Sequence, residues 1–195
     1  GECWKGSGCD NMVLVTLGTG VGGGIIINGK PLVGRNGAAG EIGHLVMNRE
    51  ETLICGCGKR GCAEQYCSAT GVVRLANRYL DAHDDESVLR RKRVIHCKDV
   101  FDAAKKGDIA SMKILDQMFD LLGMFLANVC CTMDPEVIVL GGGVSKAGQP
   151  LLEGAKRYFD QYIFHASKSI RFNLASLGND AGAYGACKLV LDAYK

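Results

Sequence analysis

The chain contains 195 residues, of which 47% are hydrophobic and 23% are charged, a balance typical of a soluble globular protein. This composition excludes disordered, collagen-like and low-complexity chains. The net charge of +2 is too even for a dedicated nucleic-acid-binding protein, and no apolar run reaches the roughly 18 residues of a membrane span. The length suffices for one large hydrophobic core.

The first predicted elements are short strands. The apolar run Met12–Leu17 predicts a strand, and the glycine-rich residues 18–24 predict a turn after it. Residues 25–27 predict a second strand, which the Asn-Gly pair at 28–29 joins to a third strand at 31–33. This part of the chain is therefore expected to form an antiparallel meander.

The later part of the chain predicts helices that alternate with strands. Helices are expected at residues 70–80, 98–106, 109–133, 149–164 and 181–194, and strands at residues 136–140 and 170–177. Asp108 is a suitable N-cap for the longest helix, and Pro135 stops it. Asn179 or Asp180 is expected to cap the last helix. A meander followed by this alternation predicts an α/β domain with a mixed sheet and flanking helices.

The glycine segment matches a dinucleotide-binding pattern at Gly18, Gly20 and Gly23. That motif needs a helix directly after the glycines, whereas strand and turn residues follow here, so the dinucleotide interpretation is rejected. A glycine hairpin can still hold phosphate, because backbone N–H groups converge where no Cβ atoms intervene, and Thr19 adds a hydroxyl. Five glycines in the seven residues 18–24 exceed the needs of a plain hairpin, which favours a phosphate site.

Residues 34–67 are rich in glycine and cysteine without a clear period, and we interpret them as an ordered loop held by something other than a core. His44 precedes Cys55, Cys57 and Cys62 at a spacing suited to a tetrahedral site of three thiolates and one imidazole, which is a structural zinc site. Glycines between the cysteines resemble a metal knuckle. The alternative, four reduced residues without metal, is less favoured. Bound zinc would fix a loop that has no core of its own.

The remaining cysteines are assigned other roles. Cys67 is a less favoured substitute ligand, and Cys130 and Cys131 fall on the long predicted helix and are expected in the core. Ten cysteines are too few for a disulfide scaffold of this length, and their clustered spacing indicates a reducing compartment. We therefore expect a cytoplasmic location.

Polar side chains beside the metal spacing predict a polyol-binding site. Glu41 and His44 lie in the sequence Gly-Glu-Ile-Gly-His, and Glu64 follows Cys62 by two residues. Each glutamate alone is most simply a solvated surface residue. Together on one metal-braced loop, two carboxylates and an imidazole are suited to the hydroxyl groups of a sugar.

These motifs resemble the ROK family (repressors, open reading frames and kinases), and within it the bacterial ATP-dependent glucokinases. Residues 17–24 look like the family's phosphate segment, residues 37–44 like its sugar motif, and residues 55–64 like its zinc motif. The glycines at 141–143 and residues 177–182 resemble later family segments. The resemblance covers essentially the whole chain. It implies an actin-like, ribonuclease-H-like ATPase fold and transfer of the γ-phosphoryl group of ATP to a hexose.

The resemblance also implies individual roles. The sugar-binding residues would be Glu41, His44 and Glu64. The zinc ligands would be His44, Cys55, Cys57 and Cys62, with one His44 ring nitrogen on the metal and the other toward the sugar. The ATP-binding residues would be Gly18, Thr19, Gly20, Gly142 and Gly143. Mg²⁺ would accompany ATP.

Two parts of the family pattern are not found in this chain. The catalytic base in the family is the Asp of an Asn-Asp pair a short way before the Gly-Glu that here is Gly1-Glu2, and an N-terminal Asp-x-Gly-Gly phosphate segment also precedes it. Asn179-Asp180 looks like the missing pair, but it opens the last predicted helix. We therefore expect residues 1–195 to be the large C-terminal lobe of a ROK-type sugar kinase, with a zinc- and sugar-binding loop at 35–68. Without the N-terminal lobe, this chain alone is expected to be inactive.

Alternatives concern the substrate and the class of protein. Glucose is the expected hexose, and N-acetylmannosamine or fructose is the alternative. A sugar-responsive ROK repressor would keep the zinc and sugar motifs but would not need the phosphate hairpin, and a zinc-binding interaction module would leave that hairpin unexplained. The expected partners are a hexose, ATP and a second copy of the chain, with no nucleic acid and no membrane. The basic run at residues 90–93 does not predict a nucleic-acid site, because the acidic residues at 81–86 oppose its charge. We interpret it as an exposed helix end.

Overall fold

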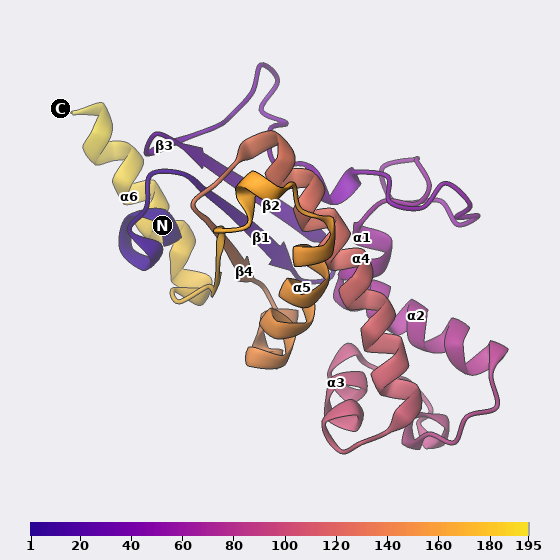
Figure 1. Ribbon diagram of the computed structural model, residues 1–195. Coiled ribbons are helices and arrows are strands. Elements are labelled where there is room, and N and C mark those ends of the chain that lie inside the picture. Colours follow the sequence, from indigo (N-terminus) through magenta and orange to yellow (C-terminus); the bar gives the residue numbers. More distant parts are fainter. Residues whose placement is uncertain (195) are drawn as a thin grey trace.

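The apolar run Met12–Leu17 (β1) lies at the centre of a mixed five-stranded sheet in the computed structural model, which describes residues 1–194. Strand β2 (Val21–Ile27) pairs with β1 antiparallel, and β3 (Lys30–Pro31) pairs with β2 in the same way. On its other side β1 is parallel to β4 (Val137–Gly141), which is parallel to β5 (Arg171–Leu174). The order is therefore β3-β2-β1-β4-β5, and both the predicted meander and the mixed sheet are confirmed (Figure 1).

Helices surround this sheet close to where the sequence predicts them. The α-helices are α1 (Glu64–Cys67), α2 (Ala69–Ala82), α3 (Cys97–Lys105), α4 (Ile109–Met133), α5 (Gln149–Tyr162) and α6 (Ala181–Ala193). Shorter helical turns span Glu2–Ser7, Ile42–His44, Val88–Arg91, Val144–Ala147, His165–Ser167 and Gly178–Asp180. Among the α-helices of residues 1–194, only α1 falls where a loop is predicted.

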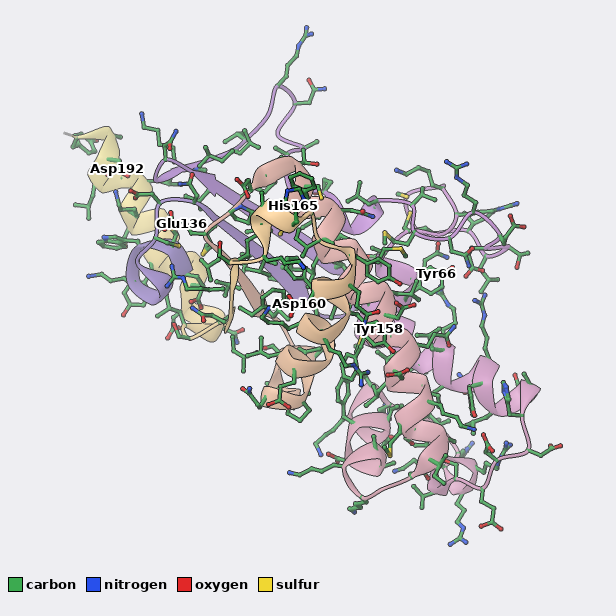
Figure 2. The ribbon with its side chains drawn as sticks, viewed as in Figure 1. Tyr66, Glu136, Tyr158, Asp160, His165 and Asp192 are labelled. Carbon is green, nitrogen blue, oxygen red and sulfur yellow. The ribbon has the colours of Figure 1, made fainter. Side chains whose placement is uncertain are left out.

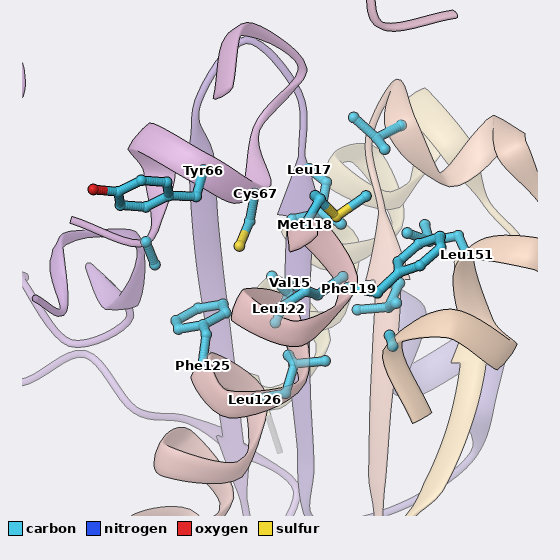
Figure 3. Close-up of a cluster of buried hydrophobic side chains, with 14 of the residues drawn as sticks. Val15, Leu17, Tyr66, Cys67, Met118, Phe119, Leu122, Phe125, Leu126 and Leu151 are labelled. Carbon is cyan, nitrogen blue, oxygen red and sulfur yellow. The ribbon is translucent and has the colours of Figure 1, made fainter. Parts of the chain in front are cut away.

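Helix α4 forms the centre of the hydrophobic core and packs against α2, α3 and α5 (Figure 1). Figure 3 shows Leu122 of this helix close to Val15 of β1. It begins as predicted, because the Asp108 side chain accepts a hydrogen bond from the Ser111 N–H at 2.8 Å. It ends at Asp134, which adopts the left-handed conformation directly before Pro135. By length and composition alone, α4 could cross a membrane. However, 61% of its most apolar window is buried inside the protein. It is a core helix of this domain.

Two predictions about helical side chains are wrong. Cys130 is buried as expected, but Cys131 is exposed, because it lies about 100° further round the helix axis and falls on the face that α4 turns to solvent. Asp180 does not cap α6 with its side chain. The turn Gly178–Asp180 runs directly into α6, so Asp180 has helical dihedral angles in place of the extended ones that an N-cap needs.

The start of the chain packs against its C-terminal part. The Glu2 carboxylate accepts hydrogen bonds from the Leu177 N–H at 2.7 Å and from the Ser176 hydroxyl at 3.1 Å. Trp4 meets Tyr184 of α6 edge to face. No residue of α6 is buried, so this helix contacts the domain mainly through the N-terminal turn.

Candidate functional site

Both glycine segments that the resemblance assigns to ATP lie at the same edge of the sheet. The register pairs Thr16 of β1 with Gly141 of the parallel strand β4, so the residues that follow each strand are neighbours. Gly142 has φ +83°, and a Cβ atom at this position would lie 2.6 Å from the Leu17 carbonyl oxygen. Only glycine therefore permits this approach. The carboxyl ends of parallel strands are where open α/β sheets bind ligands.

The glycine hairpin is shorter than the sequence suggests. Residues 18–20 form the turn, whereas the three later glycines belong to β2. A Cβ atom on Gly23 would lie 2.5 Å from both the Gly40 carbonyl oxygen and the Ile42 side chain. Part of the glycine excess therefore lets residues 40–42 pack on β2, and it is not evidence for phosphate. A strand follows the glycines, which confirms the rejection of the dinucleotide motif.

A cavity of about 420 Å³ adjoins the second glycine segment. Gly143 and Val144 line one side, Ala69 at the start of α2 lines another, and His96 and Phe101 line the side toward α3. This volume is within the usual range for small-molecule pockets, and its lining is mostly apolar. The cavity is therefore suited to the flat, largely apolar base of a nucleoside.

The four residues of the predicted metal spacing come together in one cluster. The ligand atoms of His44, Cys55, Cys57 and Cys62 all lie within 4.8 Å of one another. The Cys55 Sγ is 3.7 Å from His44 Nδ1, and the Cys57 and Cys62 sulfurs are 3.6 Å apart. Tetrahedral coordination by zinc separates two thiolates by about 3.8 Å and a thiolate from an imidazole nitrogen by about 3.6 Å. The donor set and its spacing therefore fit a tetrahedral metal ion.

Local backbone structure presents these ligands. The Cys55 N–H donates to the Lys59 carbonyl at 2.7 Å, which closes a tight loop around Cys57. Gly58 adopts φ +85° within this loop, a conformation that glycine adopts without strain. Gly61 is also left-handed, and a Cβ atom on it would lie 1.7 Å from the Asn48 carbonyl oxygen. Gly58 and Gly61 therefore allow the tight turns between the cysteines that a metal knuckle needs.

A buried carboxylate that sequence reasoning missed anchors the far side of this loop. Glu51 is 4% exposed, and its carboxylate receives two hydrogen bonds from the Arg78 guanidinium of α2 at 2.7 and 2.8 Å and one from the Tyr66 hydroxyl at 2.7 Å. Figure 2 shows Tyr66 between the loop and α2. The Arg78 hydrogen bonds hold the pKa of Glu51 well below its usual range. Burial, followed by the Glu51 contact, raises the pKa of Tyr66 to about 12.

The predicted loop ends earlier than residue 67. Tyr66 and Cys67 are buried in the main core, as Figure 3 shows, so α1 belongs to the packed body of the domain. Burial raises the pKa of the Cys67 thiol to about 12. Cys67 lies outside the four-residue cluster. The sequence placed this segment in a loop because four residues are too few to show a helical period.

The three predicted sugar-binding residues surround the metal cluster. His44 turns Nδ1 toward the sulfur of Cys55, and its Nε2 lies 3.9 Å from the Glu41 carboxylate. The Glu41 side chain is 69% exposed, so it is free to contact a solute. Glu64 begins α1, and its Oε2 accepts a hydrogen bond from the Val21 N–H at 3.0 Å. Its Oε1 lies 3.7 Å from the Cys55 sulfur.

Comparison with known proteins identifies the family. The chain matches the ROK family over residues 1–193. It belongs to that family. Over 97% of its length it is 44% identical to a protein named glucokinase from Halalkalibacterium halodurans, of which it covers 59%. Over 71% of its length it is 38% identical to a protein named N-acetylmannosamine kinase from Yersinia pestis, of which it covers 43%.

A solved structure extends this relationship to the fold. A ROK family glucokinase from Streptomyces griseus, in complex with glucose and AMPPNP, matches with a TM-score of 0.85 at 33% identity, over 96% of this chain and 63% of that one. ROK sugar kinases have the actin-like ATPase fold, so the fold that the resemblance implies is confirmed. The chain spans about 60% of the length of these glucokinases.

Proposed function

We propose that residues 1–195 are the C-terminal lobe of an ATP-dependent hexose kinase that transfers the γ-phosphoryl group of ATP to glucose. The position of Glu64 carries this proposal. One of its carboxylate oxygens faces the Cys55 thiol of the metal cluster, and the other accepts the Val21 N–H beside the glycine turn. A hexose held by Glu64 would therefore lie next to the turn assigned to the ATP phosphates.

The identity of the substrate rests on the relatives. The 44% identity to a protein named glucokinase covers nearly the whole chain, which supports glucose. The 38% identity to a protein named N-acetylmannosamine kinase covers a smaller part, so N-acetylmannosamine is the second candidate. The intact turn at residues 18–20 supports a kinase over a sugar-responsive regulator, because a regulator has no need of ATP.

Each site residue has a proposed task. The carboxylates of Glu41 and Glu64 would accept hydrogen bonds from sugar hydroxyls, and the His44 nitrogen that faces Glu41 would make another. Backbone N–H groups of Thr19 and Gly20 would meet the phosphates, while the Gly18 N–H closes the turn on the Gly20 carbonyl at 2.9 Å. The nucleoside would lie against Gly142 and Gly143 and enter the cavity beside them. Mg²⁺ bound with ATP would neutralise phosphate charge.

The base that deprotonates the sugar hydroxyl is proposed to be an Asp outside residues 1–195. A positioned general base contributes about 10²–10⁴ in rate. Residues 1–195 alone would therefore retain parts of both binding sites but lack useful phosphoryl transfer.

We further propose that the ion in the Cys/His cluster is Zn²⁺. Three thiolates and one imidazole leave no open position in a tetrahedral site, so the ion would be structural. Held through His44 Nδ1, it would orient the imidazole and leave the Nε2 atom available to the sugar. Elemental analysis of the purified protein should give one zinc per chain, and a chain without zinc would contradict the assignment.

A coupled assay with ATP and a panel of glucose, N-acetylmannosamine, fructose and mannose tests the function. We expect the full-length protein that contains these residues to phosphorylate glucose with the highest kcat/KM, and we expect residues 1–195 alone to give no comparable turnover. Glucose binding without phosphoryl transfer by the full-length protein would favour the regulator. Turnover by residues 1–195 near the full-length rate would contradict the missing base.

The assembly and location remain proposals. The long apolar helix α4 is buried within its own chain, so it supplies no interface for the expected second copy. The exposed apolar residues Leu189, Val190 and Leu191 of α6 are the better candidates. Light scattering on the full-length protein tests the dimer. A cytoplasmic location is proposed from the cysteine usage.

A further inference from the structure

The turn at residues 18–20 is fixed from one side by the start of α2. The Ala69 N–H donates a hydrogen bond to the Gly18 carbonyl at 2.8 Å. The Thr70 hydroxyl donates to the Thr19 carbonyl at 2.7 Å, although these residues are 51 positions apart in the sequence. Two consecutive carbonyl groups of the turn are therefore held by two consecutive residues of one helix.

The direction of the Thr70 hydrogen bond follows from its neighbours. The Ser68 hydroxyl lies 2.9 Å from the Thr70 hydroxyl, but its own proton is donated to the Glu64 carbonyl at 2.7 Å. If the Thr70 proton turned toward Ser68, the Thr70 oxygen would face the Thr19 carbonyl oxygen at 2.7 Å as two acceptors, which is repulsive. The Thr70 proton therefore belongs to the Thr19 carbonyl.

This arrangement sets the direction of the turn's N–H groups. Every described peptide bond is trans, so the C=O of one residue and the N–H of the next point in opposite directions. Because the Gly18 and Thr19 carbonyls point toward α2, the N–H groups of Thr19 and Gly20 point away from it. Within residues 1–194 neither of these N–H groups donates to another protein group. Thr19 is exposed, and the space beside Gly18 is open.

We infer that Thr70 is a positioning residue for phosphate binding: its hydroxyl holds the Thr19 carbonyl, so that two N–H groups of the turn face an anion together. Paired backbone N–H groups with this orientation form an anion-binding concavity. The inference deepens the proposed function and rests on it, since the anion is the phosphate chain of ATP. Without the hydroxyl, the Thr19–Gly20 peptide can rotate, and glycine on one side makes that rotation easy.

Replacement of Thr70 tests this role in the full-length, metal-loaded protein. Thr70→Val keeps the shape and removes the hydroxyl, Thr70→Ala removes it without a β-branch, and Thr70→Ser keeps it. Thr132 on α4 offers a matched control, because its exposed hydroxyl donates to the Asn128 carbonyl far from the turn. The measurements are calorimetric binding of Mg-ATP and of adenosine, together with KM for ATP and for glucose.

We expect Thr70→Val and Thr70→Ala to weaken Mg-ATP binding about three- to tenfold, which corresponds to one net hydrogen bond. Adenosine affinity and KM for glucose should stay at the wild-type value, and Thr70→Ser should restore ATP binding. Thr132→Val should change none of these quantities.

Two results would overturn the inference. One is wild-type ATP affinity in both variants that lack the hydroxyl, and the other is an equal loss of ATP and adenosine binding, which indicates a general structural defect. If the wild-type protein neither binds ATP nor phosphorylates a hexose, the proposed function fails and the inference fails with it. If the wild-type protein does both, the Thr70 variants decide the inference alone.

Discussion

The metal loop at residues 45–62 and helix α4 are ordered by different means. Thirteen residues of α4 are buried, and most are apolar. The loop exposes large apolar side chains such as Ile54, and it is held at a few points by the Cys/His cluster and by Glu51 on Arg78. Loss of one contact removes only a small part of the stability of a helix that makes many contacts. Loss of one anchoring interaction should leave the loop without a fixed conformation.

This difference matches the division of tasks. The core around α4 fixes the strands whose ends carry the glycine turn, so the proposed ATP-binding segment rests on distributed apolar burial. The proposed sugar-binding residues Glu41 and His44 directly precede the loop. Glu64 connects the two regions, because it starts α1 on the core side and lies 3.7 Å from the Cys55 sulfur on the loop side.

Loss of the metal should give the largest effect and should be confined to the loop. Cys62→Ser, or a strong chelator, should abolish metal binding and remove hydrogen-exchange protection over residues 45–62, while the α4 amides stay protected. The binding energy of a structural zinc ion is folding energy for its loop, on the order of 10 kcal/mol. Cys67→Ser is the matched control and should keep the metal. Unchanged protection of the loop after chelation would contradict the distinction.

Truncation of the core should have the opposite pattern. Phe125 is fully buried on α4, and Phe125→Ala should lower the free energy of unfolding by about 3–5 kcal/mol through lost burial and a residual cavity. Urea denaturation measures this change. Metal content should remain one ion per chain, and loss of the metal in this variant would show that the loop depends on the core.

The anchor between the two regions should contribute less. Glu51→Gln removes the charge that two Arg78 hydrogen bonds stabilise, and we expect a loss of about 1–3 kcal/mol in the free energy of unfolding. Arg78 is partly exposed, so water can solvate the guanidinium that is left. Thermal unfolding measures the change. If the variant is as stable as the wild type, the attraction between Glu51 and Arg78 only offsets the free energy that their desolvation costs.

The same carboxylate predicts the response to acid. The pKa of Glu51 is lower in the folded protein than its ordinary value of 4.5, so the unfolded chain binds more protons as the pH falls. The stabilisation is therefore complete above about pH 5 and is lost progressively below the ordinary carboxyl pKa. Glu51→Gln should remove this part of the acid sensitivity, which parallel denaturation series at pH 7 and pH 4 can measure.

The smallest effect should come from Cys131, the exposed one of two neighbouring cysteines of α4. Cys130→Ser places a hydroxyl in the core and should cost about 1–3 kcal/mol, whereas Cys131→Ser on the exposed face should stay within about 0.5 kcal/mol of the wild type. If both substitutions change the midpoint of urea unfolding equally, then Cys130 does not face the core while Cys131 faces solvent.

Several features were predictable because they depend on local chemistry. The N-cap Asp108, the stop at Pro135 and the period of α4 follow from the sequence alone, and so does the spacing of His44 with the three cysteines. Glu51 was not predictable, because its partner Arg78 is 27 positions away and the sequence beside Glu51 resembles an exposed surface. The use of Gly23 was misread for the same reason, since its neighbour at Gly40 comes from a separate segment.

The sequence by itself determined the strands, most of the helices, the residues of the Cys/His cluster and the family motifs, because each depends on residues within a few turns or one short spacing. Only the tertiary structure decided that Glu64 lies between the Cys/His cluster and the glycine turn, and that the Thr70 hydroxyl bonds to the Thr19 carbonyl. Those contacts join segments more than 40 positions apart. Packing of α1 and α2 against α4, beside the turn between β1 and β2, creates them, and no local pattern encodes that packing.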